Sequence, residues 1–148
     1  MRILGHPIHP MLVHFPIVLW TVAAAAYVAA AVGMQSAAMI AKFSNGAGLV
    51  MALLAMVAGL LELTTIDSHC EAMQVATWHL MVMATAWLLF VLALVLPLAP
   101  ASSINASAAQ FGAAACACVG FVAMGAGGWL GGQLVYDFGI GVKGREKS

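Results

Sequence analysis

The sequence predicts an all-α integral membrane protein, a four-helix bundle with both ends of the chain on the same side of the bilayer. Of its 148 residues, 64% are hydrophobic and only 7% are charged, whereas soluble domains carry about 25% charged residues. So few charges cannot cover a surface that faces water. Four apolar segments are each long enough to cross a bilayer, which takes about 20 helical residues. The formal net charge is zero, so no nucleic-acid partner is expected.

The four apolar segments are the predicted membrane spans, and polar residues, glycine or proline separate them. They lie at residues 11–33, 46–64, 75–97 and 108–136. The first span is longer than the roughly 7–15 apolar residues of a signal peptide, so we expect it to be retained. The chain is therefore interpreted as a single membrane domain, residues 1–148, with no convincing internal repeat and a basic tail at 142–148.

The order of the spans assigns most of the polar chemistry to one side of the membrane. Both termini and the connection between the second and third spans share that side, and all five acidic residues fall on it or in its tail. All five histidines fall there too: His6, His9, His14, His69 and His79. Arg2 and the basic tail also lie on this side, against Lys42 on the other, so the positive-inside rule predicts that both termini are cytoplasmic.

The first candidate site pairs His14 with His79. These residues lie about three and four positions inside the first and third spans, which run in the same direction, so their imidazoles have nearly equal depth at 1.5 Å per residue. Two histidines on neighbouring helices can be the axial ligands of a b-type haem. Two other interpretations stay open: either histidine can hydrogen-bond to a neighbouring helix, or lie at the headgroup level as amphipathic rings do.

The second candidate site contains the two histidines that precede the first span. The prolines of GHPIHP disfavour helix, so we expect an extended or turned cap that carries His6 and His9. There they can meet His69, Glu62 and Asp67, and imidazole with carboxylate suits zinc, copper or iron. Both acids can instead orient a ligating histidine through its other nitrogen. The spacing matches no strong metal motif, and interfacial anchoring or proton transfer are the alternatives.

The last span ends in a glycine-rich stretch. Gly127 with Gly131, and Gly128 with Gly132, form two overlapping GxxxG pairs, which let a helix or a flat cofactor approach the backbone closely. Tyr136 follows on the same side as the histidines and can hydrogen-bond to the edge of a cofactor. Close helix packing remains the simpler interpretation.

Several of these motifs together resemble a known bacterial family of predicted four-span membrane proteins of unknown function. The resemblance covers nearly the whole chain and rests on GHPIHPMLVHFPI, the acid that ends the second span, the histidine early in the third, and GWLGGQLVYDFGIGV. Some relatives are fused to Rieske or cytochrome c domains, which implies redox work in the bacterial inner membrane. The family's motif positions in this chain are Gly5, His6, Pro7, His9, Pro10, His14, Pro16, His79, Gly131, Gly132, Tyr136, Gly139 and Gly141.

The chain departs from the family pattern near its end. Many relatives read YRHGVGV where this chain reads YDFGIGV, so Asp137 replaces an arginine and Phe138 replaces a histidine. Glu62 stands where an aspartate is common. If the missing histidine is a ligand in the relatives, this chain either has lost that ligand or uses another residue, such as His69.

These observations favour a membrane b-type cytochrome that exchanges electrons with a quinone or a redox protein, with haem b held by histidines of the first and third spans. The alternative is a subunit without enzymatic activity that anchors or stabilises a larger membrane complex. A second alternative is a transition-metal-binding accessory protein that uses His6 and His9. No nucleophile with an orienting base and acid argues for a hydrolase.

Overall fold

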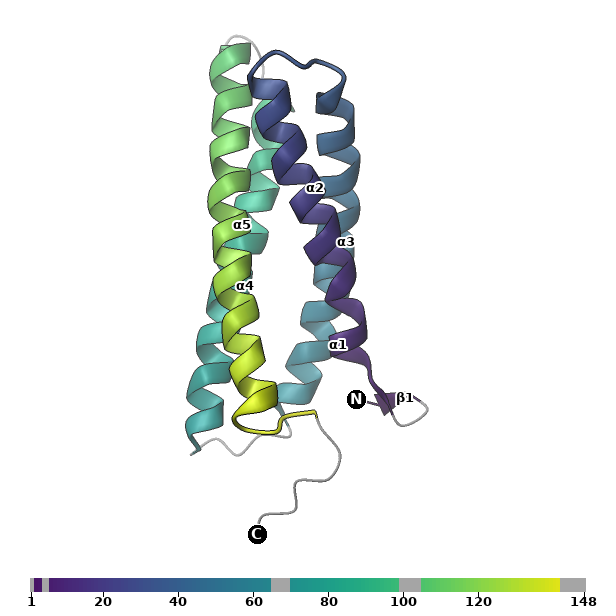
Figure 1. Ribbon diagram of the computed structural model, residues 1–148, viewed down its shortest axis with the longest axis vertical. Helices are drawn as coiled ribbons and strands as arrows, with labels where there is room; N and C mark the ends of the chain where they lie inside the picture. Colours follow the sequence, from purple (N-terminus) through teal and green to yellow (C-terminus); the bar gives the residue numbers. More distant parts are fainter. Residues whose placement is uncertain (1, 4–5, 65–69, 99–104, 142–148) are drawn as a thin grey trace.

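Four long apolar helices form the body of the protein in the computed structural model (Figure 1). The structure describes residues 2–3, 6–64, 70–98 and 105–141, with side chains from residue 8 onward. Each helix is long and apolar enough to cross a membrane. The prediction of an all-α, four-helix membrane bundle is confirmed.

The elements follow one another in an up-and-down order. Strand β1 (Arg2–Ile3) pairs antiparallel with β2 (His6–Pro7). The helices are α1 (Ile8–Leu12), α2 (His14–Ala31), α3 (Ala37–Leu63), α4 (Glu71–Val95) and α5 (Ala106–Tyr136), with the 3₁₀ turn η1 (Leu96–Leu98) after α4. Strand β1 and the last turn of α5 lie at the same end of the bundle, called here the terminal end (Figure 1).

The first helical span begins earlier than the sequence predicts. His9 and Pro10 lie in α1 rather than in an extended cap. Pro10 is the third residue of that helix, within the first turn, where a backbone N–H has no partner inside the helix. Hydrogen bonds from Val13 N to His9 O and from Ile17 N to Val13 O carry α1 into α2, so the two form one span, Ile8–Ala31.

The second span also begins earlier, at Ala37 rather than at residue 46. The polar residues that suggested a loop belong to the helix, and Asn45 is fully buried. Its amide nitrogen donates to Tyr27 Oη at 3.1 Å and to the carbonyl of Phe90 at 2.9 Å. A polar side chain is tolerated inside a membrane bundle when it hydrogen-bonds across helices in this way.

Two stacked aromatic rings pack between the helices in the half of the bundle that lies away from the terminal end. The rings of Trp20 and Phe90 are stacked with centroids 4.4 Å apart and an angle of 9° between their planes, and both side chains are fully buried. Each ring lies over a glycine on the neighbouring helix. A Cβ added to Gly48 would come within 2.6 Å of the Trp20 ring, and one added to Gly120 within 3.1 Å of the Phe90 ring. We call this region the aromatic half.

The helices separate toward the terminal end. In Figure 1, α2 lies beside α5 in the aromatic half, and toward the terminal end α2 and α1 lean away from α5. Side chains that meet neighbouring helices in this lower region, such as His9, Met83 and His79, are only half-buried. We call this region the histidine half, and it contains the candidate site.

Candidate functional site

His9 is fixed to helix α3. Its Nδ1 lies 2.7 Å from the carbonyl oxygen of Ala55. Because a carbonyl oxygen only accepts, Nδ1 carries the proton and donates it. Gly59, one turn further along α3, makes room for the ring, since a Cβ there would lie 3.1 Å from His9 Cε1 and Nδ1.

His79 is fixed to helix α5 in the same manner. Its Nδ1 lies 2.8 Å from the carbonyl oxygen of Gly127, so this nitrogen also donates. Gly131, one turn further along α5, again makes room for the ring, since a Cβ there would lie 3.2 Å from His79 Cε1. Each histidine therefore rests on the backbone of the helix that follows it.

The two imidazoles face each other from different helix pairs. Their ring centroids are 6.4 Å apart and their planes are at 89° to each other. In a neutral imidazole with its proton on Nδ1, the lone pair is on Nε2, and this is the form that binds a metal. Neither Nε2 hydrogen-bonds to any part of the chain that the structure describes.

A thioether and a carboxylate follow these contacts along the same helices. Met83, one turn after His79, packs its sulfur against the position where Gly127 would carry a Cβ. Glu62 lies three residues beyond Gly59 on α3 and is half-buried. Its Oε1 would be 3.4 Å from a Cβ on Gly141, so the chain after α5 returns to the end of α3. Gly141 has φ +81°, which favours glycine.

The structure brings His9, and not His14, to His79. His14 is exposed on the outside of the bundle. It follows His9 by five residues, which turns it by about 140° around the helix at 3.6 residues per turn. His9 instead shares a face with the buried residues Pro16 and Trp20. These two stand at i + 7 and i + 11 from His9, and this helical spacing is the signal that distinguishes His9 from His14.

The other predicted site residues fall in different places. Gly128 faces open space, and a Cβ on Gly132 would touch only Tyr136 of its own helix, at 3.9 Å. The side chain of Tyr136 is 78% exposed. Of the two glycine pairs, Gly127 with Gly131 is therefore the one that faces a histidine.

Three predicted residues lie outside what can be described. His69 and Asp67 are not among the described residues, and the side chain of His6 is not described either. Within the described ranges, no group of three or more His, Cys, Asp or Glu side chains could hold a metal ion. Sequence reasoning did not single out Ala55 or Gly59. Ala55 acts through its backbone carbonyl, which its side chain does not indicate. Gly59 could not be distinguished from any other glycine in an apolar segment.

The fold and this pair define a class: a four-span membrane bundle with two histidines between its helix pairs, near one end. The chain belongs to a family of predicted membrane proteins (DUF2231), which matches residues 5–144. No curated protein and no solved structure matched the chain.

Proposed function

We propose that the protein is a membrane b-type cytochrome whose haem iron is held by His9 and His79 and which exchanges electrons with a quinone or a redox protein. The proposal keeps the predicted use of histidines from the first and third spans and replaces His14 by His9. It is carried by one observation, the perpendicular pair of imidazoles with centroids 6.4 Å apart.

The spacing of the pair suits two ligands on opposite sides of one metal ion. Imidazole nitrogen binds such an ion at about 2.0–2.1 Å, and the ring centre lies about 1.2 Å behind the nitrogen, so the two centroids would be about 6.4 Å apart. The separation in the structure is the same.

Within the described part of the chain, the number of ligands favours haem over a bare ion. A structural zinc site uses four protein ligands and a catalytic one uses three. The described residues contribute two histidines and no third His, Cys, Asp or Glu side chain to a common site. Haem supplies its own four nitrogens and needs only axial ligands from the protein. Two histidines are then a complete set.

The chain's own groups would orient these ligands. The carbonyls of Ala55 and Gly127 hold each Nδ1–H, which sets the tautomer, fixes the ring plane and raises the basicity of Nε2. Haem would supply one-electron chemistry. His79 is nine residues into α4, about 12 Å from its start at 1.5 Å per residue, so the site would be within electron-transfer reach of a partner at the terminal end. By the positive-inside rule that end is the cytoplasmic face of the bacterial inner membrane.

The test is the absorption spectrum of protein purified in detergent from cells supplied with haem, oxidised and then reduced with dithionite. We expect a Soret band and sharp α and β bands after reduction. His9→Ala and His79→Ala should each lose the six-coordinate spectrum, and free imidazole should restore it because it replaces the missing ligand. His14→Ala is the matched control and should leave the spectrum unchanged.

Three outcomes would overturn the proposal. A colourless protein would favour the anchoring subunit, and colourless protein that carries stoichiometric metal by elemental analysis would favour the metal-binding accessory protein. Loss of the haem spectrum in His14→Ala, with His9→Ala unchanged, would return the ligand to the exposed histidine.

A further inference from the structure

The contacts of the histidine half occur twice along the chain at a nearly constant offset. The residue numbers of His9 and His79 differ by 70. The carbonyl acceptors for these rings belong to Ala55 and Gly127, and the glycines beneath them are Gly59 and Gly131. The residue numbers in both of these pairs differ by 72. One unit made of a histidine, a backbone carbonyl and a glycine is therefore present in each half of the chain.

The aromatic half repeats at the same two offsets. The numbers of Trp20 and Phe90 differ by 70, and those of Gly48 and Gly120 differ by 72. A Cβ on Gly48 would meet the Trp20 ring and, at 3.3 Å, the Cβ of Leu19. One on Gly120 would meet the Phe90 ring and, also at 3.3 Å, the Cβ of the equivalent leucine, Leu89.

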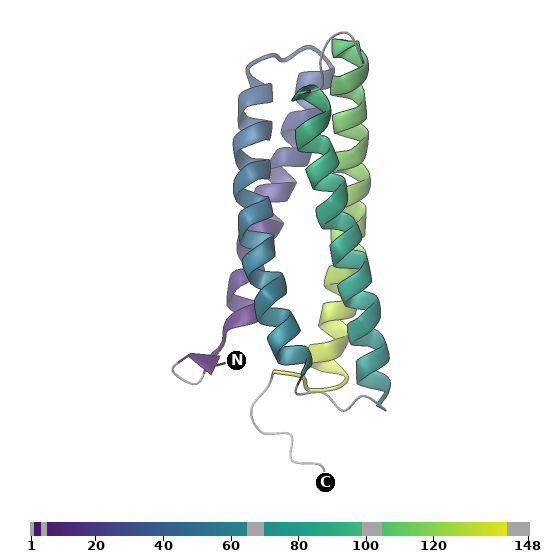
Figure 2. The same ribbon diagram turned by 180° about the vertical axis from the view of Figure 1, so that it is seen from behind.

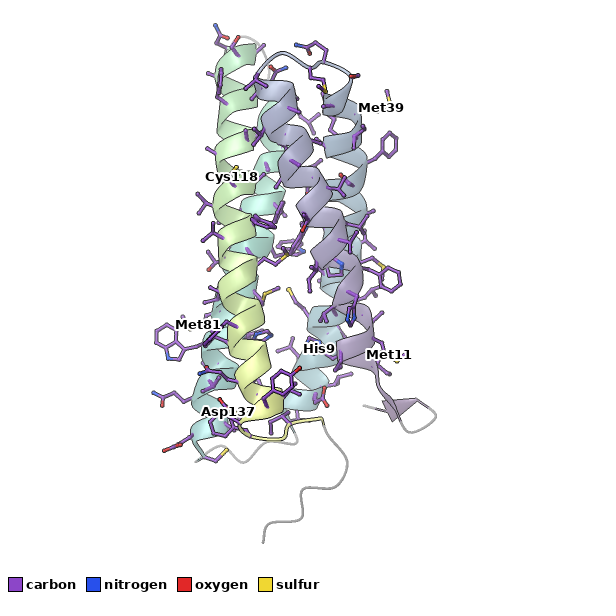
Figure 3. All side chains as sticks on the ribbon, in the orientation of Figure 1. His9, Met11, Met39, Met81, Cys118 and Asp137 are labelled. Atoms are coloured by element: carbon purple, nitrogen blue, oxygen red, sulfur yellow. The ribbon has the colours of Figure 1, made fainter. Side chains whose placement is uncertain are left out.

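Residues that face outward follow the same rule. The numbers of Met11 and Met81 also differ by 70. Their side chains are 61% and 55% exposed and point away from the bundle on opposite sides (Figure 3). The first helix of each half thus repeats with the smaller offset and the second with the larger. The second half therefore has a net two extra residues between Phe90 and Gly120, in the segment that includes the connection between α4 and α5.

The two halves are related by a rotation about the long axis of the bundle. In Figure 1, α5 stands at the left and α1–α2 run to the lower right; after the half-turn of Figure 2, α3 stands at the left and α4 runs to the lower right. His9 contacts its own counterpart His79, and Trp20 contacts its own counterpart Phe90. A contact between a residue and its own equivalent lies on a twofold axis.

We propose that residues 8–63 and 71–136 are two copies of one helix hairpin joined around a twofold axis, and that Gly59 and Gly131 are the equivalent positioning residues that seat His9 and His79 as matched ligands of one group bound on that axis. The role of the two glycines in positioning the ligands rests on the proposed function, whereas the duplication of the hairpin does not. The sequence alone hides the repeat because few residues are shared: those at the contacts described here are the histidines, the leucines, the glycines at 48 and 120, and those at 59 and 131.

The twofold axis has a consequence for the ligand. A group bound on this axis would receive a bond from the same imidazole nitrogen on each of its two faces. The two rings would also make the same angle with the axis. Haem meets this demand because its two axial positions are equivalent. The added Cβ distances of 3.1 Å and 3.2 Å at the two glycines mean that alanine would push either ring by a similar amount.

The first arm of the test measures the symmetry without any cofactor. Spin labels are placed on the exposed positions Val18 and Val122 in one protein, and on Leu88 and Val50 in another, after the native cysteines are replaced. A twofold axis exchanges these two pairs, so pulsed electron paramagnetic resonance should give distances that agree within the width of either distribution. Distances that differ by more would refute the duplication, whatever the colour of the protein.

The second arm measures the matched half-sites. Gly59→Ala and Gly131→Ala should each weaken haem binding about tenfold, the lower range for groups that support a metal ligand, and should change the low-spin spectrum alike. Gly128→Ala, which faces open space, is the control and should bind haem normally.

The results separate the two proposals. Loss of haem in only one of the two glycine variants, or in the Gly128→Ala control, would refute the matched half-sites. A colourless wild-type protein with equal label distances would refute the cytochrome and support the duplication.

Discussion

The aromatic half and the histidine half share one arrangement of rings and glycines but differ in how closely the two rings approach each other. In both, a ring from the first or third span lies over a glycine of the next helix and faces its own counterpart. The aromatic rings are stacked at 4.4 Å and fully buried, whereas the histidine rings are 6.4 Å apart, perpendicular and half-buried. The aromatic rings are in direct stacking contact, whereas the separation of the histidine rings equals that expected for two imidazoles bound to one metal ion. We infer that the aromatic half holds the bundle together while the histidine half holds a ligand.

The largest expected effect tests this division in the aromatic half. Trp20→Ala removes a fully buried stacked ring and should lower the free energy of unfolding by about 3–5 kcal/mol, measured by thermal unfolding in detergent.

Trp20→Phe is the matched control and should lower the free energy of unfolding much less. It keeps a stacking ring and removes an indole N–H that has no hydrogen-bond partner in the described part of the chain. The folded fraction of either variant should bind haem normally. If Trp20→Ala instead lost haem while remaining as stable as the native protein, the division would be wrong.

A smaller effect is expected at Asn45. Asn45→Ala removes two hydrogen bonds between helices and should cost about 1–2 kcal/mol of stability, the upper range for such bonds in membrane proteins. Ser44→Ala, next to it, removes only bonds to the serine's own helix and should change the midpoint of unfolding far less. Equal midpoints for the two variants would show that the cross-helix bonds contribute nothing.

The smallest effect distinguishes the two copies of the histidine unit. Glu62 on α3 corresponds to Leu134 on α5, so a carboxylate lies beyond only one histidine. Glu62→Gln should raise the midpoint potential of the haem, because a nearby negative charge favours the ferric form. The effect is on the order of 1 kcal/mol for one charge at an effective dielectric constant near 20. Glu71→Gln, exposed at the start of α4, should leave the potential unchanged. A redox titration that gave equal potentials for the native protein and Glu62→Gln would exclude Glu62 as a charge that acts on the site.

The sequence predicted the membrane bundle because composition and apolar length determine it directly. It misplaced the start of α3 because Ser44, Asn45 and Gly46 are typical of loops, and only the contacts of Asn45 with Tyr27 and Phe90 explain a buried amide there.

The candidate site was predicted in part. His79 and Gly131 were identified, and His9 was assigned to a cap because prolines surround it. Its partnership with His79 depends on a helix that begins at residue 8 and on the carbonyls of Ala55 and Gly127, and a backbone acceptor leaves no mark in the sequence. The repeat that we propose was not predicted for a related reason, since it preserves contacts more than residue types.

The central claim is that His9 and His79 bind one haem iron with their ring planes perpendicular, and electron paramagnetic resonance of the ferric protein tests it most directly. Perpendicular imidazole planes make the two iron orbitals that π-bond with the imidazoles (dxz and dyz) nearly equal in energy, so we predict the highly anisotropic low-spin signal that such haems give, from the angle of 89° between the rings. His14→Ala should leave this signal unchanged. A high-spin signal, or a rhombic low-spin signal from parallel imidazoles, would contradict the account.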